Sequence, residues 1–319
     1  MEFDPPPVPQ PEPHPEPEVE IPIWFENALK ITPTSHHVQV QDCDIHYLRW
    51  GPPESEQESE QVSEKPGILF IHGAGCNAQW WSFIAPFFCA DRAIAAIDLS
   101  GMGDSGWRES YGSGCHVAEI AAVLADAGLG EKPIIVGHSF GGYMTMCHGK
   151  DHGAELSGAI IVDSPLRPEN RQTEAGRRAY DPPKRPANRV FTDPEEMVYR
   201  FRTIPPQYCE NEYILEHIAR KSLKPCEGGY TWKFDPAARV AGLHDEPLED
   251  YLCAMTCPKA LIYGDDSAIF GPDVVDYMSP IFDPANPMIG IPDAQHHIAI
   301  DQPLAFVTAL RAIFAGWGV

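Results

Sequence analysis

The sequence has no long apolar run, no excess of positive charge and no regular spacing of cysteines. Since no stretch of about 18 apolar residues occurs, we expect no membrane span. A net charge of −23 argues against nucleic acid or an anionic membrane surface as a partner. The nine cysteines are scattered without the paired spacing of a zinc site, and an odd number favours free thiols over a disulfide framework. Because the N-terminal stretch also lacks the basic start and apolar segment of a signal peptide, we predict a cytoplasmic protein.

The negative charge is concentrated near the N-terminus. Residues 1–65 hold 14 acidic and 3 basic side chains. Residues 1–20 contain eight prolines and are expected to form an extended tail, and residues 52–65 are expected to form an acidic loop. Residues 1–65 therefore carry nearly half of the net charge, so the acidity says little about a site.

From residue 66 onward, short apolar runs alternate with helix-like segments. Continuous apolar runs are typical of strands that are buried on both faces. Six such runs occur, at 66–73, 92–101, 132–139, 156–165, 258–266 and 287–294. Helical patterns lie at 116–130 and 304–317, and residues 36–51 alternate like an antiparallel hairpin. This order predicts an α/β fold with a doubly wound, mostly parallel sheet.

One long stretch without a strong strand pattern lies between Asp163 and Pro258. An insertion of this length in an α/β domain is typically a lid or cap over the carboxyl ends of the strands. We therefore divide the chain into four parts, with a mainly helical cap as the third. The parts are a tail and lead-in at 1–35, a first core part at 36–165, the cap at 166–235 and a second core part at 236–319.

The clearest chemical motif is GHSFGG at 137–142, directly after a predicted strand. A Gly-x-Ser-x-Gly sequence between a strand and a helix is the pattern of a nucleophile elbow. Gly137 and Gly141 permit close approach of the backbone, so that Ser139 projects its hydroxyl from a tight turn. A serine hydroxyl needs a histidine base and an orienting acid to become a good nucleophile. Ser139 is therefore the candidate nucleophile.

A second motif, HGAG at 72–75, follows the first apolar strand of the core. In this arrangement we expect the backbone N–H groups of Ala74 and Phe140 to point at a developing oxyanion. A backbone donor needs no particular side chain, so small residues suffice at this position. An ordinary glycine turn is the alternative interpretation.

The candidate base lies in PDAQHHIAIDQP at 292–303, between the last predicted strand and the last helix. His296 and His297 compete for the role. In extended backbone, neighbouring side chains point in opposite directions, so only one of the two can face Ser139. We favour His296 and expect His297 to pack locally. The other histidines are expected to be surface or core residues.

These motifs, together with DLSGMGDSG at 98–106, resemble the α/β-hydrolase superfamily in identity and order. The resemblance runs from about residue 36 to the C-terminus and favours the serine branch that contains esterases and carbon–carbon bond hydrolases. It implies the α/β-hydrolase fold and an enzyme with no cofactor and no metal. It also implies that Ser139 is the nucleophile, His296 the base, and Ala74 and Phe140 the oxyanion-hole residues. Asp98 and Asp104 resemble the structural turn acids of the superfamily and receive no catalytic role.

The orienting acid is where the sequence departs from the superfamily's usual pattern. Members commonly carry it three residues after the glycine that ends the penultimate strand, and counting from Gly264 gives Ser267. Asp266 falls one residue short, and a slip of one residue turns a side chain to the other face. Some members place the acid after the preceding strand, which here is Asp163. We favour Asp163, with Asp266 as second candidate and Asp265 as third.

The expected reaction is hydrolysis of a small or medium carboxylic ester, with a small-molecule substrate as the partner. Trp80, Trp81 and aromatic residues of the insertion are candidate pocket residues, namely Tyr199, Phe201, Tyr208 and Tyr213. Six arginines, 167, 171, 177, 178, 200 and 202, make the insertion basic. They favour, as an alternative, carbon–carbon bond cleavage in a carboxylate-bearing substrate. A non-catalytic, ligand-binding relative is the alternative of another class, and the oligomeric state stays open.

Overall fold

Eight strands form one sheet in the computed structural model, which describes residues 20–51, 65–168, 188–238, 247–282 and 284–319. The order across the sheet is β1-β2-β4-β3-β5-β6-β9-β10. The strands span Thr34–Val40 (β1), Cys43–Trp50 (β2), Ile68–Ile71 (β3), Ile94–Ile97 (β4), Ile134–His138 (β5), Gly158–Val162 (β6), Lys259–Gly264 (β9) and Met288–Ile291 (β10). The pairs from β4 to β10 are parallel, and β1 and β2 are antiparallel to their neighbours. The predicted fold class is confirmed.

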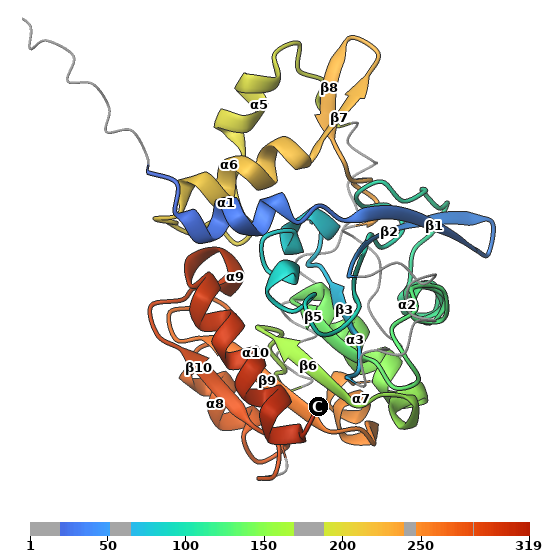
Figure 1. The fold of residues 1–319 in the computed structure, drawn as a ribbon, viewed down its shortest axis with the longest axis vertical. Coiled ribbons are helices and arrows are strands. Elements are labelled where there is room, and N and C mark those ends of the chain that lie inside the picture. Colours follow the sequence, from blue (N-terminus) through green and yellow to red (C-terminus); the bar gives the residue numbers. More distant parts are fainter. Residues whose placement is uncertain (1–19, 52–64, 169–187, 239–246, 283) are drawn as a thin grey trace, which may run out of the picture.

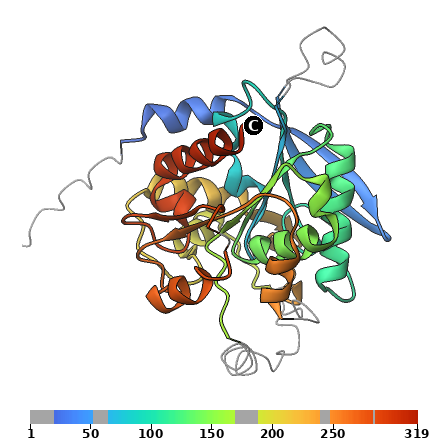
Figure 2. The same cartoon turned by 90° about the horizontal axis from the view of Figure 1, so that it is seen from below.

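Helices cover both faces of this sheet, because each central strand presents buried residues on both sides. In β3, Ile68 and Phe70 join the core under α10, and Leu69 and Ile71 join the core under α2 and α3. Figures 1 and 2 show α10 and α2 on opposite sides of the sheet. The helices span Ile23–Lys30 (α1), Ser113–Asp126 (α2), Phe140–His152 (α3), Pro194–Arg200 (α5), Glu212–Lys221 (α6), Leu248–Ala254 (α7), Pro272–Met278 (α8), Ile298–Asp301 (α9) and Pro303–Trp317 (α10). Among the described residues, no helix is both long and apolar enough to cross a bilayer.

The predicted hairpin at 36–51 is confirmed and begins two residues earlier than expected. Val40 pairs with Cys43 across a two-residue turn. Both turn residues, Gln41 and Asp42, have positive φ angles of 49° and 63°. Two successive left-handed residues match the twist of the strands and set their register.

The lead-in before the hairpin contains a helix, α1, that the sequence pattern did not reveal. Phe25 of this helix is buried, and its ring lies 4.9 Å from that of Tyr213 and 5.8 Å from that of Phe83. The helix has only eight residues, so its stability comes from this packing more than from helix propensity. The proline-rich tail at 1–19 and the acidic loop at 52–64 lie outside the described residues.

The insertion contains two helices and a small hairpin in its described part. Here α5 and α6 are followed by β7 (Leu223–Cys226) and β8 (Gly229–Trp232), an antiparallel pair. These strands escaped prediction because they have four residues each, are only partly buried, and include Pro225. In Figure 1 the insertion lies at the top of the molecule, beside α1. It contacts the loop after β3 through a hydrogen bond of 2.9 Å from Asn77 Nδ2 to Ser222 Oγ.

Candidate active site

Ser139 occupies a strained turn between β5 and α3. Its φ and ψ angles are 53° and −116°, outside the conformations that ordinary residues prefer. Two contacts fix this backbone: Ser139 N–H donates to Val162 O at 2.8 Å, and Ser164 Oγ donates to Ser139 O at 2.8 Å. The residue remains partly exposed. The turn therefore holds an accessible hydroxyl at the N-terminus of a helix.

Glycine is required on both sides of Ser139 for steric reasons. A Cβ atom at Gly137 would lie 2.3 Å from Gly141 O, and one at Gly141 would lie 2.5 Å from Ile71 O. The close approach of α3 to β5 and β3 depends on the missing side chains. This agrees with the interpretation of GHSFGG as a tight strand-to-helix turn.

Gly141→Ala is therefore expected to destabilise the fold by about 2 kcal/mol or more, since the added methyl group meets backbone atoms that cannot move independently. Chemical denaturation measures the free energy of unfolding. Gly114→Ala is the matched control, because a Cβ atom there meets nothing within 4 Å and Gly114 lies in α2. This control should keep or slightly raise the stability. Equal stability of the two variants would contradict the steric argument.

His296 is hydrogen bonded to Asp163. The distance from His296 Nδ1 to Asp163 Oδ2 is 2.6 Å, and both side chains are buried, at 2% and 0% exposure. Asp163 follows β6 with a positive φ of 47°, so the chain turns sharply there and the carboxylate is directed toward β9 and the histidine loop. Two further donors hold it: Gly264 N–H donates to Oδ1 at 3.0 Å, and Ser267 Oγ donates to Oδ2 at 2.7 Å.

The other two candidate acids lie apart from this pair. Asp265 and Asp266 are exposed, and their backbone N–H groups bond to Ile291 O and Ala294 O. No hydrogen bond links either carboxylate to His296 in the described structure. Ser267, the residue at the superfamily's usual acid position, instead donates to Asp163. The structure thus brings His296 together with the first candidate acid and not with the second or third.

Among the described residues, no hydrogen bond joins the side chains of Ser139 and His296. His138, the residue before Ser139, donates from Nε2 to His296 O at 2.9 Å, and the two rings are 4.7 Å apart. Because Nδ1 of His296 donates to Asp163, its Nε2 is the nitrogen with a lone pair available to accept a proton. Hydrogen bonds between a nucleophile and its base are often long in the free enzyme and shorten when substrate binds.

The HGAG loop runs beside Ser139. A Cβ atom built at Gly73 would lie 3.4 Å from Ser139 Cβ. Among the described hydrogen bonds, none uses the backbone N–H of Ala74 or of Phe140, the first residue of α3. The N–H of Phe140 has no acceptor within the helix because it lies in the first turn of α3. Both candidate oxyanion donors are therefore available next to the serine.

His72 fixes the shape of this loop. Its Nδ1 donates to Gly73 O at 2.7 Å, and its Nε2 accepts from Leu99 N–H at 3.1 Å. Burial lowers the pKa of His72, so the ring is neutral and can both donate and accept. His72 was expected to be an ordinary surface or core residue, although it begins the HGAG motif.

Asp98 has the structural role expected of a turn acid. Its carboxylate accepts hydrogen bonds from His46 Nδ1 at 2.7 Å, from Ala78 N–H at 2.6 Å and from Asp104 N–H at 2.8 Å. Burial opposes ionisation, but the contacts with His46, His72 and the Asp104 N–H together outweigh it, and the pKa of Asp98 is lowered. Asp104 itself pairs with Lys233 at 2.7 Å. These acids link loops around the site and do not contact Ser139.

A cavity of about 270 Å³ lies between the HGAG loop and the insertion. Ala74, Trp80 and His297 line it from the core, and Phe201 and Trp232 line it from the insertion. Other members of its wall are Thr203, Ile204, Ser222 and Phe234. A cavity next to both the oxyanion loop and the insertion is the expected position for a substrate.

Only two of the predicted pocket aromatics, Trp80 and Phe201, line this cavity. Trp81 packs into the core against Phe70, at a ring distance of 4.8 Å. The remaining three tyrosines lie elsewhere: Tyr199 and Tyr208 are 79% and 75% exposed, and Tyr213 packs against Phe25. Their types suit a pocket, but none of the three lines this cavity.

The cavity has a partly basic rim. Arg200 pairs with Glu196 at 2.8 Å, and Lys233 pairs with Asp104. Arg202 donates to two backbone carbonyls, at 2.8 and 2.6 Å, and pairs with no carboxylate among the described residues. Arg167 lies elsewhere and donates to Ile269 O. The predicted arginines 171, 177 and 178 lie outside the described residues.

The model of the alpha/beta hydrolase family matches residues 68–310. This range includes the HGAG loop, Ser139, Asp163 and His296. The chain therefore belongs to the α/β hydrolase family and is a hydrolase.

Curated relatives include two proteins of Mycobacterium tuberculosis. The chain is similar to the lipase LipV, at 30% identity over 38% of this chain and 41% of that protein. It is also similar to the esterase Rv0045c, at 24% identity over 86% of this chain and 88% of that protein.

Solved structures resemble the chain over most of its length. The structure of Rv0045c, reported together with transition-metal inhibition of that esterase, has a TM-score of 0.68 at 21% identity, covering 92% of this chain and 97% of that chain. E-2-(acetamidomethylene)succinate hydrolase has a TM-score of 0.72 at 17% identity, covering 89% and 99%. At these identities the likeness shows the fold alone.

Proposed function

We propose that this protein is a serine esterase that cleaves small or medium carboxylic esters through an acyl-enzyme. The observation that carries the proposal is the combination of Ser139 in its strained, accessible turn with the buried His296–Asp163 hydrogen bond beside it. The similarity to esterase Rv0045c along most of the chain supports the same reaction class.

In the proposed reaction, Ser139 Oγ attacks the ester carbonyl carbon while His296 Nε2 accepts the hydroxyl proton. The negative charge that develops on the carbonyl oxygen is bound by the N–H groups of Ala74 and Phe140. His296 then donates the proton to the departing alcohol, and the acyl group remains on Ser139. Water repeats the sequence to release the acid. Asp163 keeps the Nδ1 proton in place and stabilises the cationic ring.

The insertion is proposed to act as a cap that limits the size of the substrate. Ligand pockets commonly have volumes of roughly 300–1,000 Å³, and the cavity of about 270 Å³ lies just below that range. Its wall from the insertion includes Phe201 and Trp232, which suit an apolar group. A short or medium acyl chain therefore fits better than a long one.

A series of p-nitrophenyl esters of increasing acyl length tests this proposal. We expect rapid turnover with a maximum of kcat/KM at a short or medium chain, and a steep fall toward palmitate. Slow turnover of every member would count against the esterase function. A rate that rises steadily to palmitate would count against the proposed size limit.

Carbon–carbon bond cleavage in a carboxylate-bearing substrate is a second candidate, and Arg202 is the observation that favours it. Arg202 is the cation of the cavity wall without a carboxylate partner among the described residues. A guanidinium with free donors is suited to bind a carboxylate. Under this function, simple p-nitrophenyl esters would be poor substrates.

Arg202→Gln separates the two candidates. If the substrate carries a carboxylate, the variant should raise KM for a hemisuccinate ester by roughly tenfold or more, because a charge-assisted hydrogen bond is lost. KM for a neutral ester of similar size should not change. Steady-state kinetics with both esters measures the effect, and Arg220→Gln, an exposed arginine paired with Glu195 and Glu216 away from the cavity wall, is the control. Equal KM values with and without Arg202 would remove the support for a carboxylate site.

A further inference from the structure

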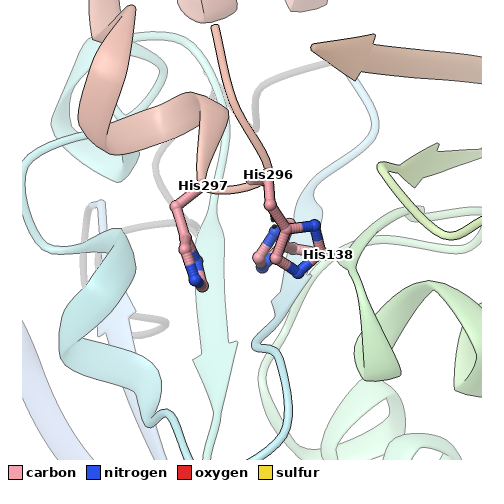
Figure 3. A group of neighbouring side chains, drawn as sticks. All are labelled: His138, His296 and His297. Carbon is pink, nitrogen blue, oxygen red and sulfur yellow. Dashed lines mark hydrogen bonds between the residues drawn. The ribbon is translucent and has the colours of Figure 1, made fainter. Parts of the chain in front are cut away.

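Three buried histidines from two distant segments gather beside Ser139. His138 ends β5, and His296 and His297 lie in the loop between β10 and α9. Figure 3 shows the three side chains directed toward one region. The ring centroids are 4.7 to 5.2 Å apart, and one ring nitrogen of each residue lies within 4.8 Å of one from each of the others. All three are more than nine-tenths buried.

The outer contacts determine which nitrogen of each ring carries the proton. His138 Nε2 faces His296 O at 2.9 Å, and His297 Nε2 faces Ile204 O at 3.2 Å. His296 Nδ1 faces the Asp163 carboxylate at 2.6 Å. Carbonyl and carboxylate oxygens only accept, so each of these nitrogens donates. The lone pairs are therefore on His138 Nδ1, His297 Nδ1 and His296 Nε2.

Histidines that bind a metal ion have this arrangement. A metal-ligating imidazole typically donates its second N–H to a backbone carbonyl or a carboxylate, which fixes the ring and raises its basicity as a ligand. All three rings of the cluster have such a partner: two carbonyls and Asp163. These hydrogen bonds hold the three rings as the corresponding bonds do in a metal-binding site.

The cluster also has a ring nitrogen without a partner, and a small cavity adjoins it. His297 Nδ1 is buried and has no hydrogen-bond partner among the described residues, which is costly for a polar atom. His138 and His297 also line a small cavity of about 20 Å³, enough for one water molecule or ion.

We propose that His138, His296 and His297 form an inhibitory site for a divalent transition-metal ion, with Zn²⁺ as the representative ligand. Three neutral imidazole nitrogens suit Zn²⁺ and Cu²⁺, whereas Mg²⁺ and Ca²⁺ prefer oxygen ligands. Asp163, through His296, offsets part of the charge of the ion. The inhibition rests on the proposed function, because the ion would occupy the lone pair of His296 Nε2 that accepts the proton of Ser139.

The geometry requires a modest closure of the rings. Zn–N bonds of about 2.0–2.1 Å in a tetrahedral site place the nitrogens roughly 3.3 Å apart. One nitrogen of each ring now lies within 4.8 Å of one nitrogen of each other ring. A pair of nitrogens at that distance must approach by roughly 1.5 Å. Small rotations of the side chains achieve this, and the fourth position is left for water or for Ser139.

The test combines inhibition with direct binding. Zn²⁺ is titrated against hydrolysis of p-nitrophenyl butyrate in a non-chelating buffer, and zinc binding to Ser139→Ala is measured by calorimetry. We expect inhibition that a chelator reverses, one zinc bound per chain, and no effect of Mg²⁺. His138→Phe and His297→Phe should each raise the zinc concentration for half-inhibition by tenfold or more, with each variant compared with its own uninhibited rate.

His148→Phe is the matched control, because His148 is also buried and burial lowers its pKa to about 4, but it lies on α3 outside the cluster. It should leave inhibition unchanged. Unchanged half-inhibition in both cluster variants, activation by zinc, or no zinc binding would overturn the site. A protein that binds zinc through these histidines but hydrolyses no ester would overturn the proposed function and the inhibitory role, and leave the site standing. Two cluster variants, each checked by thermal melting, allow for failure of one to fold.

Discussion

Ser139→Ala is expected to lower kcat for ester hydrolysis by roughly 10⁶-fold, the loss found when the nucleophile of a comparable serine site is removed. Alanine keeps the backbone contacts that hold the turn, namely the bonds to Val162 O and from Ser164 Oγ. Only the hydroxyl is lost, and alanine provides no nucleophile in its place. The residual rate should come from oxyanion binding and from positioning of substrate alone.

Steady-state hydrolysis of p-nitrophenyl butyrate measures this loss, and a fluorophosphonate probe reports the nucleophile directly. Wild-type protein should react with the probe at Ser139, and the variant should not react. Ser82→Ala is the control, since Ser82 is a buried serine that bonds to Gln79 O and His217 away from the elbow. Turnover retained by Ser139→Ala would refute the assignment. A wild-type protein that does not react with the probe would favour a non-catalytic relative.

The parallel core could be predicted because its sequence signal is local. Strands such as β3 and β5 are continuous apolar runs, and burial on both faces leaves little ambiguity in such a segment. The sequence signal for the turn at Ser139 is equally local, because two glycines at fixed spacing avoid clashes between a Cβ atom and nearby backbone atoms. By contrast, α1 owes its helical state to contacts of Phe25 with residues far along the chain, which no local pattern records.

The environment of His296 depended on contacts between segments distant in the sequence. The position of His296 in the loop could be predicted from the sequence, but its neighbours in the fold could not. Its partner Asp163 is 133 residues away, and its neighbour His138 is 158 residues away. Ser267 could have been noticed, because a hydroxyl at the usual acid position is able to donate to a carboxylate from the neighbouring strand. The histidine cluster could not have been predicted from the sequence, because its members become neighbours only when β5 and the loop after β10 come together in the fold.

Asp163→Asn is expected to lower kcat by roughly 10⁴-fold, as in serine sites whose orienting aspartate is changed to asparagine. The geometry gives the reason. Because Gly264 N–H donates to Oδ1, the amide oxygen of asparagine must take that position. The NH₂ group then faces His296 Nδ1, which has to accept a hydrogen bond instead of donating one. The ring proton moves to Nε2, and His296 can no longer accept the proton of Ser139.

Asp266→Asn is the matched control, because it makes the same chemical change on the neighbouring loop in an exposed side chain with no bond to His296. Its kcat should stay within about twofold of wild type, since surface changes away from a site have small effects. Both rates are measured at saturating ester, with thermal melting to verify folding. A large loss in Asp266→Asn with activity retained in Asp163→Asn would transfer the acid role to the loop after β9. It would also mean that this loop rearranges when substrate binds, because only then could Asp266 reach the histidine.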